Sequence, residues 1–242
     1  MKMHSQPITR NMKKLILLLI PYIFSYICYG QFFSGYGINI GLGLSNQHWK
    51  YNTEFTSEFS HWNDNKIGFI GQFYVEKEIF KFLTIKPSIG YIQKGFVSNI
   101  KVANVHGEIF TVKDDIVVLH NLSFDLAFRV IPFEKFNKLY FIIGSRLDYL
   151  IDYSSVMDEY IVNNFQLFRS LFENYNKITF GGIIGLGISF EEIIFLTIDY
   201  NPAFTKNFDS TLAELNISDS YSIYDQYFSL TIGLNIGQLI KK

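Results

Sequence analysis

Apolar and non-apolar residues alternate one by one along three segments of this chain, residues 35–45, 178–190 and 227–237. In each segment one set of alternate positions carries mainly Ile, Leu, Phe or Tyr, and the other set carries mainly Gly, Ser, Thr or Asn. Successive side chains of a β-strand point to opposite faces of a sheet. The period of two therefore predicts three strands, each with one apolar face.

Five more segments repeat this alternation less regularly. Each of the eight segments is long enough to cross a bilayer at a tilt, which takes ~9–11 residues. After residue 31 no stretch reaches the ~18 consecutive apolar residues that a membrane-spanning helix needs. The five further predicted strands are residues 66–77, 82–94, 116–131, 138–151 and 193–203.

The connections between the predicted strands alternate between short and long. The short ones are residues 78–81, 132–137 and 191–192, and the long ones are residues 46–65, 97–113, 152–176 and 204–223. Short turns at one end and long loops at the other are typical of outer-membrane barrels, and an even number of strands closes the sheet without an exposed edge. The sequence thus predicts an all-β fold, an eight-stranded antiparallel up-and-down transmembrane β-barrel.

The two faces of the predicted barrel differ in a way that sets its direction. A soluble lipocalin-type barrel places apolar side chains inside and charged ones outside. Here the non-apolar face is rich in small residues, which fit a narrow lumen, so we expect the apolar face to contact lipid. Following the alternation, four positive and four negative residues fall on the inner face: Glu76, Lys86, Lys94, Asp125, Arg129, Arg146, Asp148 and Asp199.

Pairing of these charges would give a packed polar lumen, because eight strands leave room only for side chains or one small ligand. A charge that faced lipid near the midplane would instead cost ~2–4 kcal/mol for Arg or Lys. Two interpretations of this lumen remain, a structural plug of salt bridges and a pathway for protons or ions.

Residues 1–30 have the features of a secretory signal peptide. The segment Met12-Lys13-Lys14 precedes an apolar run over residues 15–27, which is shorter than the ~20 apolar residues of a transmembrane helix. We expect cleavage between Gly30 and Gln31, so that residues 31–242 form the barrel domain. Residues 1–11 are either part of an extended positive region or a stretch upstream of a true start at Met12.

Composition agrees with an exported membrane barrel of a Gram-negative bacterium. Charged residues make up only 18% of the chain, and the 25 Phe and 16 Tyr would serve aromatic girdles at two membrane interfaces. A net charge of −1 gives no electrostatic basis for binding nucleic acid. The only cysteine, Cys28, falls in the predicted signal peptide, and the bulky Ile27 before it disfavours processing as a lipoprotein.

Residues suited to catalysis or metal binding are scarce. His48, His61 and His106 fall in predicted loops without a second metal ligand at short spacing. His120 falls on the apolar face of its strand, where we expect it near the membrane interface. No pair of His and Ser lies on a strand near the C-terminus, as the lipid-modifying hydrolases among barrels would require. We therefore expect no enzyme activity, no metal and no cofactor.

The long loop over residues 152–176 contains a second type of periodicity. Its residues Ile161, Phe165, Phe168, Phe172 and Tyr175 recur at spacings of three and four, which predicts an amphipathic helix. Such a helix would either cap the mouth of the barrel or offer an apolar surface to lipid or to a partner protein.

Short motifs along the whole mature region resemble the PorT-like outer membrane protein beta-barrel domain family. They lie at residues 31, 35–42, 67–71, 87, 91–95, 128–130, 140–144, 182–187 and 199–201. Two positions depart from the family pattern, since Ser88 stands where an acid is common and Asp199 where an arginine is common. The resemblance implies an integral outer-membrane protein, and a minority of such proteins are linked to type IX secretion.

Four functions follow as hypotheses. The first is a structural or interaction protein that acts through its four long loops, with outer-membrane lipid and lipopolysaccharide around it and a protein partner at loop 152–176. The second is an accessory component of a secretion machine. A lipid-modifying enzyme and a narrow pore are the remaining two, and nucleic acid is not an expected partner.

Overall fold

The structure is a computed structural model, which describes eight parts of the chain: residues 33–52, 59–98, 101–103, 109–111, 115–132, 138–155, 174–211 and 220–241. The predicted signal peptide, its cleavage site between Gly30 and Gln31, and Cys28 lie outside the described residues. So do His106 and four positions of the predicted helix in loop 152–176.

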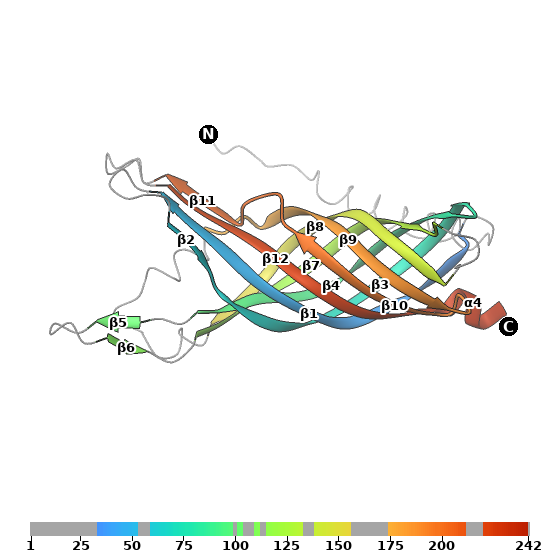
Figure 1. The fold of residues 1–242 in the computed structure, drawn as a ribbon, viewed down its shortest axis with the longest axis horizontal. Coiled ribbons are helices and arrows are strands. Elements are labelled where there is room, and N and C mark those ends of the chain that lie inside the picture. Colours follow the sequence, from blue (N-terminus) through green and yellow to red (C-terminus); the bar gives the residue numbers. More distant parts are fainter. Residues whose placement is uncertain are drawn as a thin grey trace, which may run out of the picture.

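Eight long antiparallel strands form a closed barrel, because each pairs with its neighbours in the chain and the last strand pairs with the first (Figure 1). The predicted eight-stranded up-and-down β-barrel is confirmed. The strands are β1 (Gly35–Asn52), β3 (Asp64–Phe80), β4 (Leu83–Ser98), β7 (Asp115–Val130), β8 (Leu139–Ser155), β9 (Ile178–Phe190), β10 (Ile194–Pro202) and β12 (Ser220–Asn235).

The two ends of the barrel differ. At one end, which we call the turn end, residues 81–82 join β3 to β4, residues 191–193 join β9 to β10, and β12 continues into the helix α4 (Ile236–Lys241). At the other, the loop end, β2 (Phe59–Trp62) pairs with β1 and β11 (Phe208–Thr211) pairs with β12, and β5 (Lys101–Ala103) and β6 (Ile109–Thr111) form a separate hairpin (Figure 1).

An apolar band surrounds the barrel on its outer surface. Its members alternate along each strand with buried polar or small residues, as on β3, where Ile67, Phe69 and Phe73 are exposed and Lys66, Gly68 and Glu76 are buried. Contiguous exposed apolar surface of this extent is rare on a soluble monomer and matches a lipid-facing barrel wall. In the described parts of the chain, no helix is long and apolar enough to span a membrane.

Toward the loop end the apolar band stops at one level on neighbouring strands. The outward positions change from Leu44 to Asn46 on β1 and from Phe228 to Gln226 on β12, and Asn46 is paired with Gln226. Beyond this level the inner face becomes apolar instead, since Ile223 is completely buried. The part of the barrel above the band therefore resembles a soluble protein, with an apolar interior and a polar exterior.

This exchange of faces explains where the predicted strand ends were wrong. β1 runs on to Asn52 instead of ending near residue 45, and β12 starts at Ser220 instead of near residue 227. The alternation that revealed these strands inverts above the band, so it no longer distinguishes strand from loop. At the turn end, Ile236 was assigned to the last strand but is the first residue of α4.

Candidate functional site in the barrel lumen

The eight charged residues expected on the inner face all lie in the barrel interior. Glu76, Lys86, Lys94, Arg146 and Asp148 are buried. Asp125, Arg129 and Asp199 are partly buried, and their side chains contact residues of other strands or line the lumen cavity. Five of the eight form two ion-paired clusters, and the other three, Lys86, Asp125 and Asp199, line a small polar cavity between the clusters.

The larger cluster lies toward the loop end and is built on Asp148. Its Oδ2 atom accepts from Nζ of Lys94 at 2.6 Å and from Nε of Arg146 at 3.0 Å. Lys94 also lies 3.6 Å from Oδ2 of Asp225 on β12. Because β4, β8 and β12 are not neighbours in the sheet, these contacts cross the lumen.

Arg146 extends this cluster across to β10 and β12. Its Nη1 atom donates to Oδ1 of Asn201 at 2.6 Å and to the hydroxyl of Tyr227. The guanidinium carbon lies 4.2 Å from the centre of the Tyr227 ring, within the range of a cation–π contact. Three different strands therefore hold the Arg146 guanidinium in place.

The second cluster lies near the turn end and consists of a bidentate ion pair. Arg129 donates from Nη1 to Oε1 of Glu76 at 3.0 Å and from Nη2 to Oε2 at 3.3 Å. Nδ2 of Asn235 donates to Oε2 of Glu76 at 3.4 Å, and the Arg129 guanidinium lies 4.8 Å from the ring centre of Phe195. Parallel N–H···O bonds of this kind fix both partners in orientation as well as in distance.

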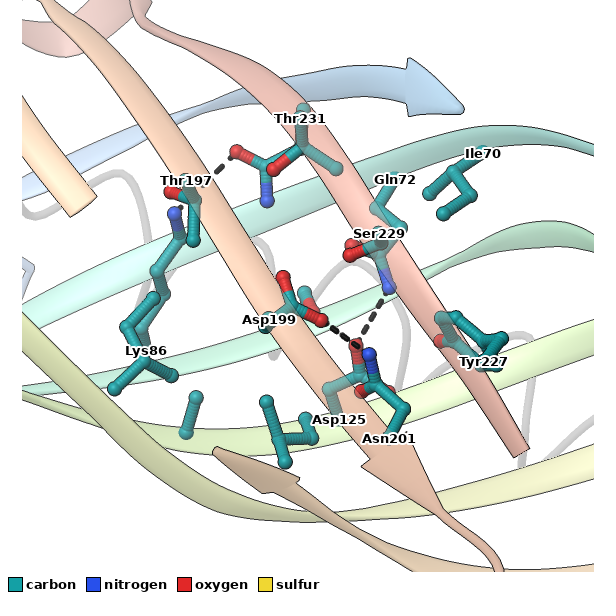
Figure 2. Close-up of a pocket in the computed structure, with 15 residues that line it drawn as sticks. Ile70, Gln72, Lys86, Asp125, Thr197, Asp199, Asn201, Tyr227, Ser229 and Thr231 are labelled. Atoms are coloured by element: carbon teal, nitrogen blue, oxygen red, sulfur yellow. Dashed lines mark hydrogen bonds between the residues drawn. The ribbon is translucent and has the colours of Figure 1, made fainter. Parts of the chain in front are cut away.

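Between the clusters lies a polar cavity of about 50 Å³, shown in Figure 2. On one side Asp125 accepts a hydrogen bond from Nε2 of Gln72 at 2.6 Å, and on the other Asp199 accepts one from Asn201. The ammonium of Lys86 donates to Asn39 Oδ1 at 3.3 Å. At ~15 Å³ for each water position, the cavity has room for roughly three water molecules and for no larger solute.

Close contacts between aromatic rings and glycines narrow the lumen near the turn end. A Cβ atom at Gly187 would overlap the ring of Tyr140, and one at Gly37 would overlap Tyr74. The hydroxyl of Tyr140 lies 2.7 Å from Oγ1 of Thr197 on β10. The small residues on the inner face thus make space for large rings from neighbouring strands, and the lumen is filled at this level.

An apolar plug closes the lumen at the loop end. Its buried members, drawn from three strands and one connection, are Phe96, Val117, Leu119, Tyr175 and Ile223, and Trp49, Leu150, Tyr153 and Phe208 pack around them. Tyr175 is the one described member of the helical pattern in loop 152–176, and its hydroxyl donates to Gln47 Oε1 at 3.1 Å. At this position the loop contributes to the closure of the barrel mouth.

Two lumen charges were missed by the sequence reasoning. Asp225 is buried and accepts from Nε2 of Gln47 at 2.7 Å and from Nδ2 of Asn207 at 2.6 Å. It precedes residue 227, where the alternation that predicts the last strand begins, so no alternation marks it as inward. Lys66 is also buried. It is the first residue of a predicted strand, where the alternation does not yet indicate whether a side chain faces inward or outward.

The remaining candidate residues lie away from the lumen. His120 lies on the outer face of β7, where its Nδ1 is 2.5 Å from the hydroxyl of Tyr91 on β4. His48 lies on the outer face of β1 above the apolar band. Within the described ranges, no three side chains of His, Cys, Asp or Glu are placed to hold a metal ion.

The chain resembles known proteins both in sequence and in fold. A model of the family "Outer membrane protein beta-barrel domain" matches residues 31–209. A search among curated proteins gives no match. Solved structures similar in fold include Neisserial surface protein A (9% identity, 81% of this chain and 97% of that chain, TM-score 0.40). Another is Ail, the attachment invasion locus protein of Yersinia pestis (11% identity, 81% and 97%, TM-score 0.31).

Proposed function

Because the chain belongs to the outer membrane protein beta-barrel domain family, we propose that it is a closed, non-conducting barrel that acts structurally or through its long extracellular loops. The protein is integral to the bacterial outer membrane. Short turns of such barrels lie in the periplasm and long loops lie outside. The turn end therefore faces the periplasm, and the loop end faces the exterior.

The observation that carries the proposal is the filling of the lumen at successive levels. An ion entering from outside meets the apolar plug, then the cluster of Lys94, Arg146 and Asp148, and then the Glu76–Arg129 pair. Moving any of these charges aside would leave its partner buried and unpaired, at a cost of about 3–5 kcal/mol. These barriers in series favour a plug of salt bridges over an ion pathway.

The extracellular part of the barrel supports a role in interaction. The strands continue past the apolar band, and β2, β11 and the β5–β6 hairpin add structure around the mouth (Figure 1). A barrel that served only as a membrane anchor would not need strands beyond the band. We expect a partner to engage these extensions rather than the lumen.

Planar-bilayer recording tests the closed lumen. Purified, refolded protein is expected to give no steady conductance, and the variant Lys177→Met, which changes an exposed lysine outside the lumen, is the matched control. A triple variant, Lys94→Ala with Arg146→Ala and Asp148→Ala, should produce conductance if it folds, which heat-modifiable gel migration checks. Steady conductance of the unmodified protein would refute the proposal.

A second candidate, an accessory role in a secretion machine of the type IX kind, draws support from the periplasmic end. Leu239 and Ile240 of α4 are exposed there, and such apolar residues on a short helix offer a contact for a periplasmic protein. Pull-down from native membranes should recover a stable periplasmic partner that is lost in a Leu239→Ser, Ile240→Ser variant. If this variant still recovers the same partner, α4 is not the contact and no longer favours the secretion role.

The proposal assigns no catalytic activity to the barrel. Incubation with lipopolysaccharide, followed by mass spectrometry of its acyl chains, should show no change. Loss or transfer of an acyl group would contradict it.

A further inference from the structure

The segment of residues 174–177, which we call the strap, joins two parts of the barrel wall at the loop end. Its carbonyl at Lys177 accepts from the amide of Leu150 on β8 at 2.7 Å. The amide of Asn176 donates to the carbonyl of Asn207, next to β11, at 2.7 Å, and its side chain donates to another carbonyl of the same connection at 2.8 Å. The strap therefore lies between β8 and the residues that lead into β11.

One strap side chain points into the barrel and the other three are exposed. Tyr175 is 5% exposed and belongs to the apolar plug, where the centre of its ring lies 6.2 Å from that of Phe208. The exposed strap residues are Asn174, Asn176 and Lys177. Hydrogen bonds at exposed positions can be exchanged for bonds to water at small cost, so the buried side chain of Tyr175 is what mainly holds the strap in place.

The strap contacts both residues that hold the carboxylate of Asp225. Oδ1 of Asp225 accepts from Nε2 of Gln47 at 2.7 Å, and Oδ2 accepts from Nδ2 of Asn207 at 2.6 Å. The hydroxyl of Tyr175 donates to Oε1 of Gln47 at 3.1 Å, and the amide of Asn176 donates to the backbone of Asn207. Release of the strap would therefore remove support from both sides of Asp225 at once.

Gln47 is oriented by the hydrogen bonds to its side-chain oxygen. The side chain is completely buried, and Oε1 accepts from Nε1 of Trp49 at 3.1 Å as well as from the hydroxyl of Tyr175. Because a carboxamide holds its acceptor and donor atoms in one plane, two donors at Oε1 direct Nε2 toward Asp225. Loss of the Tyr175 hydroxyl leaves one donor, and the orientation of the amide is then less restricted.

From Asp225 the contacts continue into the ion cluster of the lumen. Oδ2 of Asp225 lies 3.6 Å from Nζ of Lys94, which donates to Asp148 at 2.6 Å. Asp148 in turn accepts from Arg146 at 3.0 Å. All four side chains are buried, so solvent screens their interactions little. A small movement of Asp225 therefore changes the electrostatic energy of the cluster.

We propose that the strap is a releasable element that couples the extracellular surface of the barrel to this ion cluster. When Tyr175 leaves the plug, Asp225 loses its supports and its contact with Lys94 weakens. The coupling is reciprocal, so a weakened cluster also releases the strap more often. The inference rests on the proposed function, in which partners engage the extracellular end. Its tests measure coupling within the barrel, whereas planar-bilayer recording measures closure, so either can fail without the other.

Limited trypsin digestion of the refolded barrel measures release of the strap. Cutting after Lys177 requires its carbonyl to leave the amide of Leu150, and such cleavage follows the fraction of the open form when opening is fast. Lys138 at the turn end is the matched internal control, since it is also exposed and its carbonyl accepts from the amide of Ser189 at 2.7 Å. The ratio of cutting at Lys177 to cutting at Lys138, determined by mass spectrometry, therefore separates strap release from general loosening.

Single variants probe the two ends of the coupling. Tyr175→Phe removes only the hydroxyl and should raise the ratio about fivefold, because one buried hydrogen bond is lost. Lys94→Met, at the far end, should raise it about threefold through the cluster. Tyr200→Phe is the matched control: it removes a hydroxyl that donates to Oε1 of Gln226 at 2.7 Å, outside these contacts, and should leave the ratio unchanged. Asp225→Asn takes the place of Lys94→Met if that variant does not fold.

The combination of Tyr175→Phe with Lys94→Met distinguishes coupling from two independent effects. If the strap and the cluster are coupled, the double variant should raise the ratio by less than the product of the two single effects, because each substitution interrupts the same contacts. A ratio unaffected by either single variant, full multiplication in the double variant, or an equal rise in Tyr200→Phe would overturn the proposal.

Discussion

The ion pair between Arg129 and Glu76 provides a direct measure of what the lumen charges contribute to stability. The side chain of Glu76 is 4% exposed and that of Arg129 is 14% exposed, so water can replace little of what either loses. Arg129→Met keeps most of the apolar stem but leaves the carboxylate of Glu76 without its ion-pair partner. We expect it to lower the free energy of unfolding by about 3–5 kcal/mol.

The reverse substitution should be milder. In Glu76→Met the guanidinium of Arg129 keeps its contact with the Phe195 ring and is the more exposed partner. We therefore expect a loss of about 2–3 kcal/mol. The double variant removes both charges and leaves two apolar side chains in contact, an exchange that is often close to neutral. The cycle should then give an interaction energy of at least about 2 kcal/mol.

Equilibrium unfolding in urea, with the barrel in detergent micelles, measures all four forms. The fluorescence of Trp49, which packs against the apolar plug, reports loss of the folded barrel. Lys138→Met at the exposed turn end is the control and should change stability by less than about 0.5 kcal/mol. If the losses of the two single variants add to within about 0.5 kcal/mol in the double variant, the pair is not coupled and the reasoning is refuted.

Three other substitutions test separate features of the fold by the same measurement. Arg146→Leu removes the guanidinium that joins Asp148, Asn201 and Tyr227, and should cost about 3–5 kcal/mol; unchanged stability would count against the network. Gly187→Ala should cost about 1–3 kcal/mol because its methyl group would meet the Tyr140 ring, and Tyr140→Leu in the same chain should recover part of the loss. Glu191 and Glu192 have φ angles of 51° and 60° in the turn of residues 191–193 between β9 and β10. Changing them to Asn-Gly should stabilise the barrel by about 1 kcal/mol or more, and a loss of stability would show that the turn is held by other contacts.

The lumen charges show which inward-facing residues can be predicted from the alternation of apolar and polar positions. Glu76, Lys86, Arg146 and Asp148 were assigned to the inner face because each falls on the polar phase of a strand whose other phase is apolar. That argument needs only the two-residue period of a strand, so it holds wherever lipid covers the outside. It failed for Asp225, since β12 above the apolar band has an apolar interior and no lipid outside.

Partners within the lumen could not be read from the sequence. Lys94 and Asp148 lie 54 residues apart on strands that are not adjacent, and their contact depends on how far each strand is shifted against its neighbours. A shift of two residues in register keeps every side chain on its face but changes which charges meet. Hydrophobic alternation carries no information about such a shift.

The sequence by itself determined the eight strands, the direction of their faces and the sign of each inward charge, because these depend on local period and on the exclusion of charge from lipid. The tertiary structure alone decided which charges pair and where the apolar plug closes the mouth. Each of those depends on the closure of β1 against β12 and on the registers around the barrel. Closure brings residues that are far apart in the chain into contact, and a local sequence pattern does not predict such contacts.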